Sequence, residues 1–303
     1  MEKIYLTFLG TAGSIPTKSR NHIAMLLSYK SENILIDCGE GTQRQFKLAS
    51  LSPSKISKIL LTHWHGDHTL GLPGLLETLS MSEYNKNLEI YGPKGTTENL
   101  SLMNKLMKFY KQYQKYKITV KEVCSKTVLE TPEYIIEALP MSHGTPSLAY
   151  SFTIKDKLRL NKEKLKKLKI TSPKDMQALS KGKSIKYNNK TLSPKSLSYI
   201  EKGRKITFIL DTLPNPNTLK LAMNSDLLIV ESTFAEEETE IASKYKHLTA
   251  SQAAQIAKKS NSKALILTHI SQRYEQSTPR LLKEAKSIFK NTKIAEDLDV
   301  IQL

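Results

Sequence analysis

The chain has 303 residues, of which 39% are hydrophobic, and only two cysteines, Cys38 and Cys124. This size supports a substantial core, the cysteine count argues against a disulfide framework, and no apolar run approaches the roughly 20 residues of a membrane span. Lysine and arginine total 46 against 29 acidic residues, a formal charge of +17, which favours a polyanionic partner unless it reflects only a lysine-rich proteome. The N-terminus lacks a basic region followed by an apolar core, so we expect no signal peptide and a reducing, cytoplasmic environment.

Strand-like and helix-like segments alternate along the chain. Their hydrophobic periodicity predicts strands at 3–10, 22–29, 32–39, 57–63, 87–93, 134–143 and 147–154. Helices are predicted at 40–49, 69–81 and 98–112. After residue 204 the alternation resumes, with strands at 205–211, 226–232 and 263–269 and helices at 250–260 and 278–291. The pattern predicts an α/β or α+β fold rather than an all-β one.

A basic segment at 155–200 interrupts this alternation. It holds thirteen lysines and one arginine against three acidic residues, so +11 of the net charge lies there. A helix is predicted at 161–169, with Leu165 and Leu168 on one face and Asn161 as N-cap. The rest is polar and rich in turn residues, which predicts an arm projecting from the main domain or a mobile loop. The alternative is a solvated, lysine-rich insertion without a partner.

Four predicted strands each end at a residue that commonly ligates metals, namely His63, His143, Asp211 and His269. Strand ends at the rim of a sheet are rigid and accessible, which suits a metal or active site. Taken singly, each has an ordinary alternative, such as a buried or surface histidine or a turn aspartate.

The cluster "HWHGDH" at 63–68 has no such alternative. In an extended chain His63 and His65 point the same way, and Gly66 permits a tight turn that brings Asp67 and His68 back to the same space. Unligated, these groups would be uncompensated at a strand end. Imidazole and carboxylate together suit zinc, with manganese as an alternative. Seven candidates, one of them a bridging carboxylate, fit two metals roughly 3.5–4 Å apart.

These motifs resemble the metallo-β-lactamase superfamily of dinuclear metal hydrolases. "HWHGDH" is similar to its signature, and His143, Asp211 and His269 follow in the order and approximate spacing of its later ligands. "LIDCGEG" is similar to its first motif, whose aspartate, here Asp37, supports the metal loop rather than binding metal. The resemblance implies an αββα four-layer sandwich as a single domain over 1–303, with the basic arm at 155–200 inserted.

Within the superfamily, the chain resembles the ribonuclease Z family. The stretches that carry the likeness are "PTKSRN", "IDCGEGTQRQ", "THWHGDHTLGLPGLL", "ESTF", "KHLTASQAAQIA" and "LTHISQRY". The resemblance implies a homodimer that cuts precursor tRNA on the 3′ side of the acceptor stem, leaving a 3′-hydroxyl on the tRNA and a 5′-phosphate on the trailer. It also implies that the basic arm grips the tRNA, although Pro173–Lys174 stands where the family arm usually has a Gly-Pro turn.

The resemblance assigns a role to each candidate residue. Two Zn²⁺ ions, or Mn²⁺, would be held by His63, His65 and His143 on one side, by Asp67, His68 and His269 on the other, and by a bridging Asp211. Asp67 would also orient a hydroxide and accept its proton. His247 would protonate the departing 3′ oxygen beside Glu231, unless it is merely a histidine at a helix N-terminus. RNA contacts would come from Lys18, Arg20, Asn21, Thr249 and Arg273, of which Arg20 could instead be a surface cation and Thr249 simply an N-cap.

Three other functions are compatible with part of this pattern. A lactamase or thioesterase on the same metals would need neither the basic arm nor "PTKSRN". An exonuclease or mRNA-processing nuclease of the superfamily would need a large domain before the last histidine, but only 57 residues lie between Asp211 and His269. A non-catalytic RNA-binding protein would be expected to have lost part of the ligand set.

Overall fold

The computed structural model describes residues 2–107, 114–124, 126–188 and 190–303. These residues form two compact units. The larger, here called the main unit, comprises Glu2–Glu130, Ile136–Phe152 and Lys205–Leu303. The smaller, here called the arm unit, comprises Thr131–Ile135 and Thr153–Arg204, and the basic segment lies within it.

The first sheet of the main unit carries the N-terminal candidate residues. Within the described residues it has seven strands in the order β18-β1-β2-β3-β4-β5-β6. Their bounds are β18 (Val300–Gln302), β1 (Ile4–Gly10), β2 (Ala24–Tyr29), β3 (Glu32–Ile36), β4 (Lys58–Leu60), β5 (Leu88–Gly92) and β6 (Ile118–Glu122). Strands β1 to β3 form an antiparallel meander, whereas β3 to β6 are parallel. The connections contain α1 (Thr42–Leu48), η1 (Pro53–Lys55), α2 (Gly66–Thr69), α3 (Leu72–Met81) and α4 (Thr96–Met107).

The second sheet carries the C-terminal candidates. In the part of the chain that the structure describes, it has seven strands in the order β17-β16-β15-β14-β9-β8-β7. Their bounds are β17 (Thr292–Ile294), β16 (Leu265–Thr268), β15 (Leu227–Glu231), β14 (Lys205–Ile209), β9 (Ser147–Ile154), β8 (Tyr134–Met141) and β7 (Lys126–Glu130). Strands β14 to β17 are parallel. The connections contain α8 (Pro216–Ala222), η2 (Glu236–Glu238), α9 (Thr239–Tyr245), α10 (Ala250–Lys259), η3 (Gln272–Tyr274) and α11 (Thr278–Ile288).

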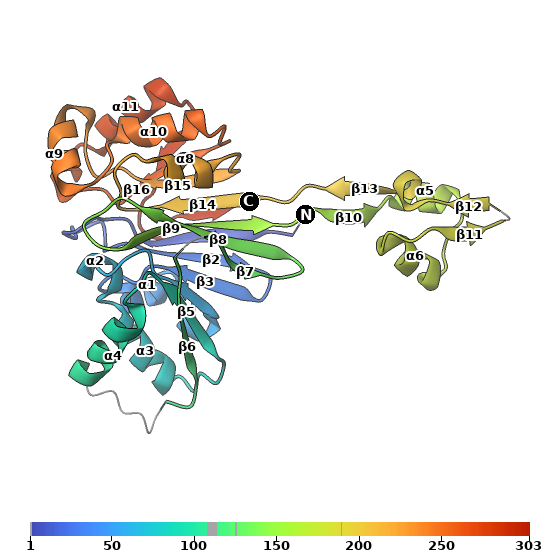
Figure 1. Cartoon of the computed structure of the whole chain (residues 1–303), viewed down its shortest axis with the longest axis horizontal. Coiled ribbons are helices and arrows are strands. Elements are labelled where there is room, and N and C mark those ends of the chain that lie inside the picture. The colour runs from blue at the N-terminus through green and yellow to red at the C-terminus, as the bar shows by residue number, and fades with distance from the viewer. Residues whose placement is uncertain (1, 108–113, 125, 189) are drawn as a thin grey trace. The chain divides into compact units, whose positions relative to one another are not determined.

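Helices cover the outer face of each sheet, as Figure 1 shows for α3 and α4 on one side and α10 and α11 on the other. Phe46 lies in the core between the first sheet and its helices, and Leu281 in the core between the second sheet and its helices. Between the sheets, the rings of Tyr29 (β2) and Phe152 (β9) pack edge to face with centroids 5.8 Å apart. Burial on both faces explains why the strands read as nearly continuous apolar runs. The predicted αββα sandwich is confirmed.

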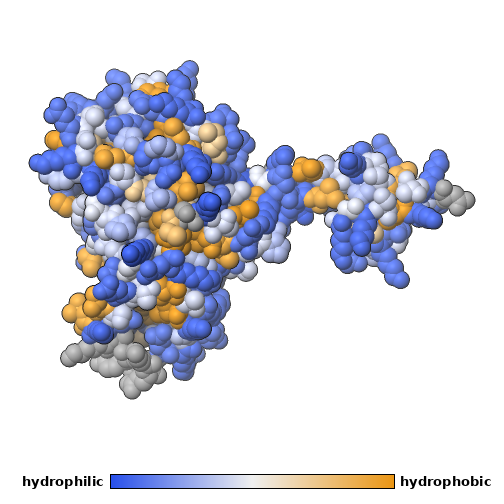
Figure 2. Space-filling model, viewed as in Figure 1, coloured by the Kyte–Doolittle hydropathy of each residue, from blue (hydrophilic) through white to orange (hydrophobic). Residues whose placement is uncertain are grey.

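The arm unit has secondary structure and a core of its own. Its elements are β10 (Lys157–Leu160), α5 (Lys162–Lys167), α6 (Pro173–Ser180), β11 (Ile185–Tyr187), β12 (Lys190–Leu192), α7 (Pro194–Leu197) and β13 (Ser198–Glu201). Strands β10 and β13 pair, as do β11 and β12. The core consists of Leu165, Ile170, Leu179, Ile185 and Leu197. Figure 2 shows mainly hydrophilic residues on the visible face of this unit. The polar, turn-rich stretch predicted as an arm or a mobile loop thus contains helices and strands, because five widely spaced apolar residues are enough to form a small core.

Most predicted elements are confirmed within a few residues. The predicted N-cap Asn161 accepts a hydrogen bond from the backbone of Lys164. The tight turn expected at Gly66 is the four-residue helix α2, which Gly66 begins without a positive φ. The helix predicted at 98–112 is observed at Thr96–Met107. Residues 108–112 of the predicted range lie outside the described residues. The final helix ends at Ile288 rather than at 291.

Among the described residues, none of the helices combines the length and the apolar character that crossing a bilayer requires.

Candidate metal centre

The candidate residues gather where strands of the two sheets end. Asp37 follows β3 directly, and His63 lies three residues beyond β4. In the second sheet Asp211 lies two residues beyond β14, and His269 follows β16. Parallel strands deliver their carboxyl ends to the same edge of a sheet, so residues far apart in sequence arrive side by side. The structure brings together all seven predicted ligands.

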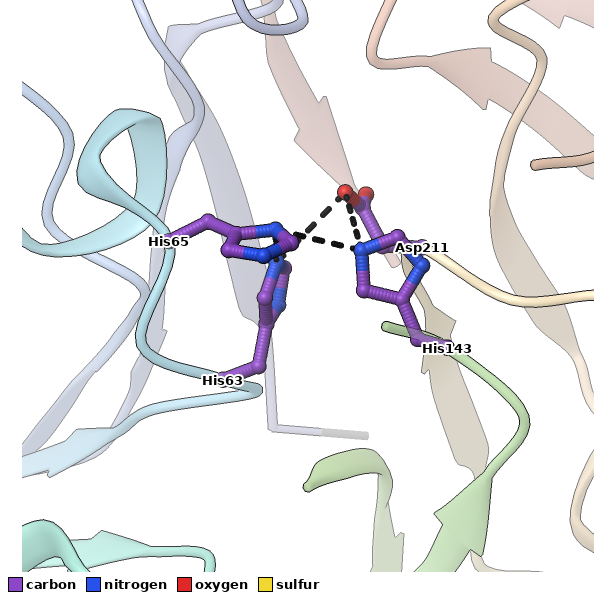
Figure 3. Close-up of side chains that lie close together, drawn as sticks. All are labelled: His63, His65, His143 and Asp211. Carbon is purple, nitrogen blue, oxygen red and sulfur yellow. Dashed lines mark hydrogen bonds and ion pairs between the residues drawn. The ribbon is translucent and has the colours of Figure 1, made fainter. Parts of the chain in front are cut away.

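The first group consists of His63, His65, His143 and Asp211, whose ligand atoms all lie within 4.8 Å of one another. Figure 3 shows the three imidazoles converging on the Asp211 carboxylate. Nδ1 of His65 lies 3.0 Å from Nε2 of His63 and 3.1 Å from Nε2 of His143. Oδ2 of Asp211 lies 3.5 Å from Nε2 of His63 and 3.7 Å from Nε2 of His143.

The second group consists of Asp67, His68, Asp211 and His269, again within 4.8 Å. Nε2 of His68 lies 3.2 Å from Nε2 of His269. Oδ2 of Asp67 lies 3.3 Å from Nε2 of His269 and 3.5 Å from Nε2 of His68. Asp211 faces both groups, with Oδ2 3.4 Å from His68 and Oδ1 3.2 Å from His269. These two groups match the two sets, sharing Asp211, that the resemblance implied. A third group within 4.8 Å consists of Asp211, Glu231, His247 and His269.

The spacing of these atoms fits divalent cations. Tetrahedral coordination with metal–nitrogen bonds of 2.0–2.1 Å places neighbouring ligand nitrogens about 3.3 Å apart, close to the 3.0–3.2 Å found here. Oδ1 of Asp211 is buried and has no hydrogen-bond partner among the described residues. A buried carboxylate oxygen left unpaired costs free energy unless a cation occupies the space beside it. The cluster is therefore able to bind a divalent metal.

Burial and close charges perturb the acid–base properties of the cluster. Burial, together with the neighbouring His68, depresses the pKa of His63 well below its usual value. Burial would also lower the pKa of His68, but the carboxylates of Asp211, Asp37 and Asp67 outweigh it and raise that pKa well above its usual value. Burial would raise the pKa of Asp211, yet the surrounding imidazoles hold it far below its usual range. These opposing shifts show how strongly the groups interact.

Behind the first sheet's histidines lies a buried carboxylate paired with a threonine. Asp37 accepts hydrogen bonds from the backbone N–H and the hydroxyl of Thr62, both at 2.7 Å. Its Oδ2 lies 2.7 Å from Nδ1 of His68, and the Thr62 hydroxyl lies 3.0 Å from Nδ1 of His63. Asp37 thus supports the cluster from outside the ligand groups.

The second sheet repeats this arrangement with different residues. Glu231 accepts hydrogen bonds from the backbone N–H of Thr212 and the hydroxyl of Thr233, both at 2.6 Å. Its Oε2 lies 2.9 Å from Nδ1 of His247, and the Thr233 hydroxyl lies 3.0 Å from Nδ1 of His269. The sequence indicated Glu231 but missed Thr62 and Thr233.

Three residues of the centre have backbone torsions in the left-handed region. The φ angles are 54° at Asp37, 39° at Asp211 and 57° at His269. For residues with a Cβ this region is unfavourable, and such conformations concentrate at functional sites. Each of these residues directly follows, or lies two residues beyond, a strand, so the turn that leaves the sheet also aims the side chain at the centre.

Lys246 is a further supporting residue that the sequence reasoning missed. It ends α9 with a left-handed backbone, and its carbonyl oxygen lies 3.0 Å from Nδ1 of His143. Its Nζ donates to the carbonyl oxygen of His143 at 3.3 Å. No residue pattern marks this contact, since it depends on where α9 ends.

Comparison with known proteins places this geometry in a family. The chain is 41% identical over 297 residues to ribonuclease Z of Nanoarchaeum equitans, covering 97% of this chain and 92% of that one. The chain belongs to the ribonuclease Z family. Ribonuclease Z of Listeria monocytogenes is 39% identical over 305 residues, covering 98% and 99%. Residues 4–286 also match the family model described as anti-Pycsar protein Apyc1, so the chain belongs to the family of that description as well.

Solved structures agree with this assignment. The short form of human tRNase Z superposes with a TM-score of 0.71 at 27% identity, covering 98% of both chains. The metallo-β-lactamase fold protein YhfI of Bacillus subtilis gives 0.72 at 18% identity and shows the fold alone. The fold and the ribonuclease Z family predicted from the sequence are both confirmed.

The residues expected to contact RNA differ in exposure and in hydrogen-bond partners in this ribonuclease Z family member. Arg20 is 6% exposed, and its Nη1 donates to Thr11 Oγ1 and to the carbonyl oxygen of Ala295, both at 2.6 Å. Burial lowers the pKa of the Arg20 guanidinium, against the opposing charge of Asp297. This cation is directed into the protein interior, and its phosphate contact stays a prediction.

Two further members of that set have structural partners. Nδ2 of Asn21 donates to the carbonyl oxygen of Glu40 at 2.7 Å. Thr249 is buried and forms a capping box with Gln252 at the start of α10. Both residues therefore have structural roles, and their RNA contacts stay predictions.

The remaining two cations are more accessible. Arg273 is paired with Glu238 and lies over the ring of Phe234, 5.1 Å from its centroid, with 43% of its side chain exposed. Lys18 is exposed. A phosphate contact stays a prediction for these two residues.

Proposed function

We propose that this protein is a metal-dependent endoribonuclease that removes the 3′ trailer from precursor tRNA, leaving a 3′-hydroxyl on the tRNA and a 5′-phosphate on the trailer. The observation that carries the proposal is near-full-length identity of 41% to a ribonuclease Z in a chain that keeps all seven candidate ligands in two converging groups. A lactamase or thioesterase on the same fold would have no use for the lysine-rich segment of the arm unit.

Two cations, which we take to be zinc with manganese as the alternative, would be held by this chain's own groups. His63, His65 and His143 would hold one, Asp67, His68 and His269 the other, and Asp211 both. Bound together, such ions supply Lewis acidity that makes water a nucleophile near neutral pH and stabilises charge on a phosphate. Asp37 and Glu231 would orient the histidines from behind, as carboxylates do in many metal sites.

Proton transfer would fall to two side chains. Asp67 is the one carboxylate of the second group that is partly exposed, with 10% of its side chain accessible. It would orient the attacking water and accept its proton. His247 turns Nδ1 to Glu231, and within the described part of the chain its Nε2 has no hydrogen-bond partner. That nitrogen would donate a proton to the departing 3′ oxygen.

Burial would lower the pKa of His247, but the neighbouring Glu231 and Asp211 raise it to about 9. The imidazole is then protonated at neutral pH, which is the form that a general acid requires. This shift supports the assignment of His247 to the leaving group rather than to the nucleophile.

The arm unit would bind the body of the tRNA. Its thirteen lysines and one arginine give a strongly positive segment, and contacts of such residues to an RNA backbone are directed by shape and weakened by salt. Its Ser172–Pro173 step, near the position of the family's Gly-Pro turn, begins helix α6 as N-cap and first residue. We further propose that the protein acts in the cytoplasm as a homodimer, on the family likeness alone.

The test is incubation of the purified protein with a precursor tRNA, with and without a chelator, followed by mapping of both new ends. We expect one cut at the 3′ side of the acceptor stem, abolished by the chelator and restored by added zinc or manganese. An intact precursor under every metal condition would overturn the proposal. A 3′-phosphate on the tRNA would contradict the chemistry even if cleavage occurred.

A further inference from the structure

The two hydroxyls behind the metal centre, Thr62 and Thr233, stand in the same relation to their neighbours. Each lies between a buried carboxylate and the rear nitrogen of a candidate ligand. Thr62 lies 2.7 Å from Asp37 and 3.0 Å from Nδ1 of His63. Thr233 lies 2.6 Å from Glu231 and 3.0 Å from Nδ1 of His269.

A hydroxyl has a single proton, and an ionised carboxylate only accepts. The Thr62 proton is used on Asp37, so toward His63 its oxygen can only accept. Nδ1 of His63 must then carry the hydrogen. In a neutral imidazole this leaves the lone pair on Nε2, which is the nitrogen that faces His65 and Asp211.

The same count applies to the second sheet. Thr233 has two acceptors in reach, Glu231 at 2.6 Å and the carbonyl oxygen of His269 at 3.1 Å. Whichever receives the proton, the oxygen can only accept from Nδ1 of His269. The lone pair of His269 is again on Nε2, which faces His68, Asp67 and Asp211.

We infer that Thr62 and Thr233 are positioning residues that fix the tautomers of His63 and His269, so that each presents an unprotonated Nε2 to the metal centre. Each acts on a different ligand group, Thr62 on the group of His63 and Thr233 on that of His269. The inference rests on the proposed metal-dependent function, because the tautomers matter for the protein only if these histidines bind metal. The tautomers themselves are properties of the imidazoles alone.

The chain supplies a matched control in Thr268. It precedes His269 as Thr62 precedes His63, and it is fully buried, yet its hydroxyl has no hydrogen-bond partner among the described residues. Replacing an unpaired buried hydroxyl by a methyl group removes no hydrogen bond and is expected to be neutral or stabilising. Thr268→Val therefore reports what the loss of a hydroxyl next to a ligand does when the hydroxyl positions nothing.

The first measurement is zinc affinity by competition with a chromophoric chelator, after removal of bound metal. We expect Thr62→Val and Thr233→Val each to weaken one of the two zinc ions by about 10–100-fold, the usual effect of losing a group that orients a ligand. Thr62→Ser and Thr233→Ser should restore it, and Thr268→Val should bind as the parent does. Circular dichroism and thermal unfolding verify that each variant is folded.

The second measurement needs no variant. Nitrogen NMR of the ¹⁵N-histidine-labelled, metal-free protein should show His63 and His269 as the Nδ1–H tautomer. Finding Nε2–H at either, or parent-like zinc affinity in Thr62→Val and Thr233→Val, or an equal loss in Thr268→Val, would overturn the inference. Because no RNA is present, a failure to cut precursor tRNA would leave these results unaffected, and the reverse also holds.

Discussion

The residues behind the metal centre are arranged in the same way on the two sheets, but the histidines that they contact have different proposed roles. On the first, Asp37 and Thr62 hold the rear nitrogens of His68 and His63. On the second, Glu231 and Thr233 hold those of His247 and His269. One carboxylate, one threonine and two histidines thus recur on each side of the centre.

The difference lies in the histidine that contacts the carboxylate directly. His68 directs Nε2 into the second ligand group, 3.4 Å from Asp211. His247 has its Nδ1 3.9 Å from the same carboxylate and belongs to neither group of predicted ligands. Under the proposed mechanism, the same supporting arrangement would hold a metal ligand on one side and a proton donor on the other.

The largest effect is expected at Asp67, a candidate ligand beside the first sheet that has no equivalent beside the second. Asp67→Ala removes a ligand and the proton acceptor together, so the cleavage rate should fall on the order of 10⁴-fold or more. The measurement is single-turnover cleavage of a precursor tRNA. Unfolding curves should stay close to those of the parent, and near-normal turnover would exclude the proposed mechanism.

The second prediction separates His247 from His68 directly. His247→Ala should slow cleavage by about 10²–10³-fold, the scale of a lost general acid, with zinc content and tRNA affinity retained. His68→Ala should instead release zinc. Mass spectrometry of metal content and a kcat–KM split distinguish the two variants. Loss of a zinc ion from His247→Ala would make His247 a ligand and remove the contrast.

Deletion of the arm should spare both sheets. Replacing residues 158–198 with a short Gly-Ser linker is expected to weaken tRNA binding by about 10–100-fold near physiological salt, because several phosphate contacts are lost. Turnover of bis(p-nitrophenyl) phosphate should persist. A full-length variant with arm lysines changed to glutamine is the matched control. Equal losses on both substrates would mean that the arm supports folding.

The smallest effect on catalysis is expected from Arg20 and Arg273, for both of which the sequence predicted an RNA contact. Their replacement should instead change stability, and by different amounts. Arg20→Met should lower the free energy of unfolding by about 2–4 kcal/mol. Two buried hydrogen bonds are lost, together with the attraction between the guanidinium and the nearby carboxylate. Arg273→Met should cost less than about 1 kcal/mol, since its pairing with Glu238 is largely solvated. Urea unfolding measures both. Equal stabilities would argue that Arg20 is not held as the structure shows.

The sequence predicted one half of the site more fully than the other, for a physical reason. Four candidate ligands of the first sheet lie within 63–68, so their pattern can be recognised in the sequence without knowledge of the fold. His143, Asp211 and His269 could be placed only because each ends an apolar strand. Most strands of the two large sheets, and helices α1, α3, α4, α10 and α11, also followed from periodicity, whereas their arrangement as a sandwich came from the resemblance. Strands β6, β7, β17 and β18 are partly exposed and gave no such signal.

Of the supporting residues, Thr62 and Thr233 could not be predicted from the sequence. "LLTH" and "LILTH" look alike, yet the Thr62 hydroxyl lies within hydrogen-bonding distance of Asp37, His63 and His68, whereas the Thr268 hydroxyl has no partner among the described residues. The residue equivalent to Thr62 is Thr233, which lies 36 positions before the histidine it contacts. Likewise, "PTKSRN" did not reveal that Arg20 turns inward to residues near the C-terminus, because that requires knowing what packs against the loop.

The left-handed backbone at Asp37, Asp211 and His269 has a consequence for protein engineering. Glycine would relieve the torsional cost at each position, on the order of 1–2 kcal/mol. In a screen for heat resistance alone, this gain would count toward replacing residues on which the proposed hydrolysis depends, although at Asp37 the lost hydrogen bonds to Thr62 would oppose it. Selection for thermostability in this enzyme should be coupled to a cleavage assay, since three of the residues with left-handed backbone belong to the candidate metal centre.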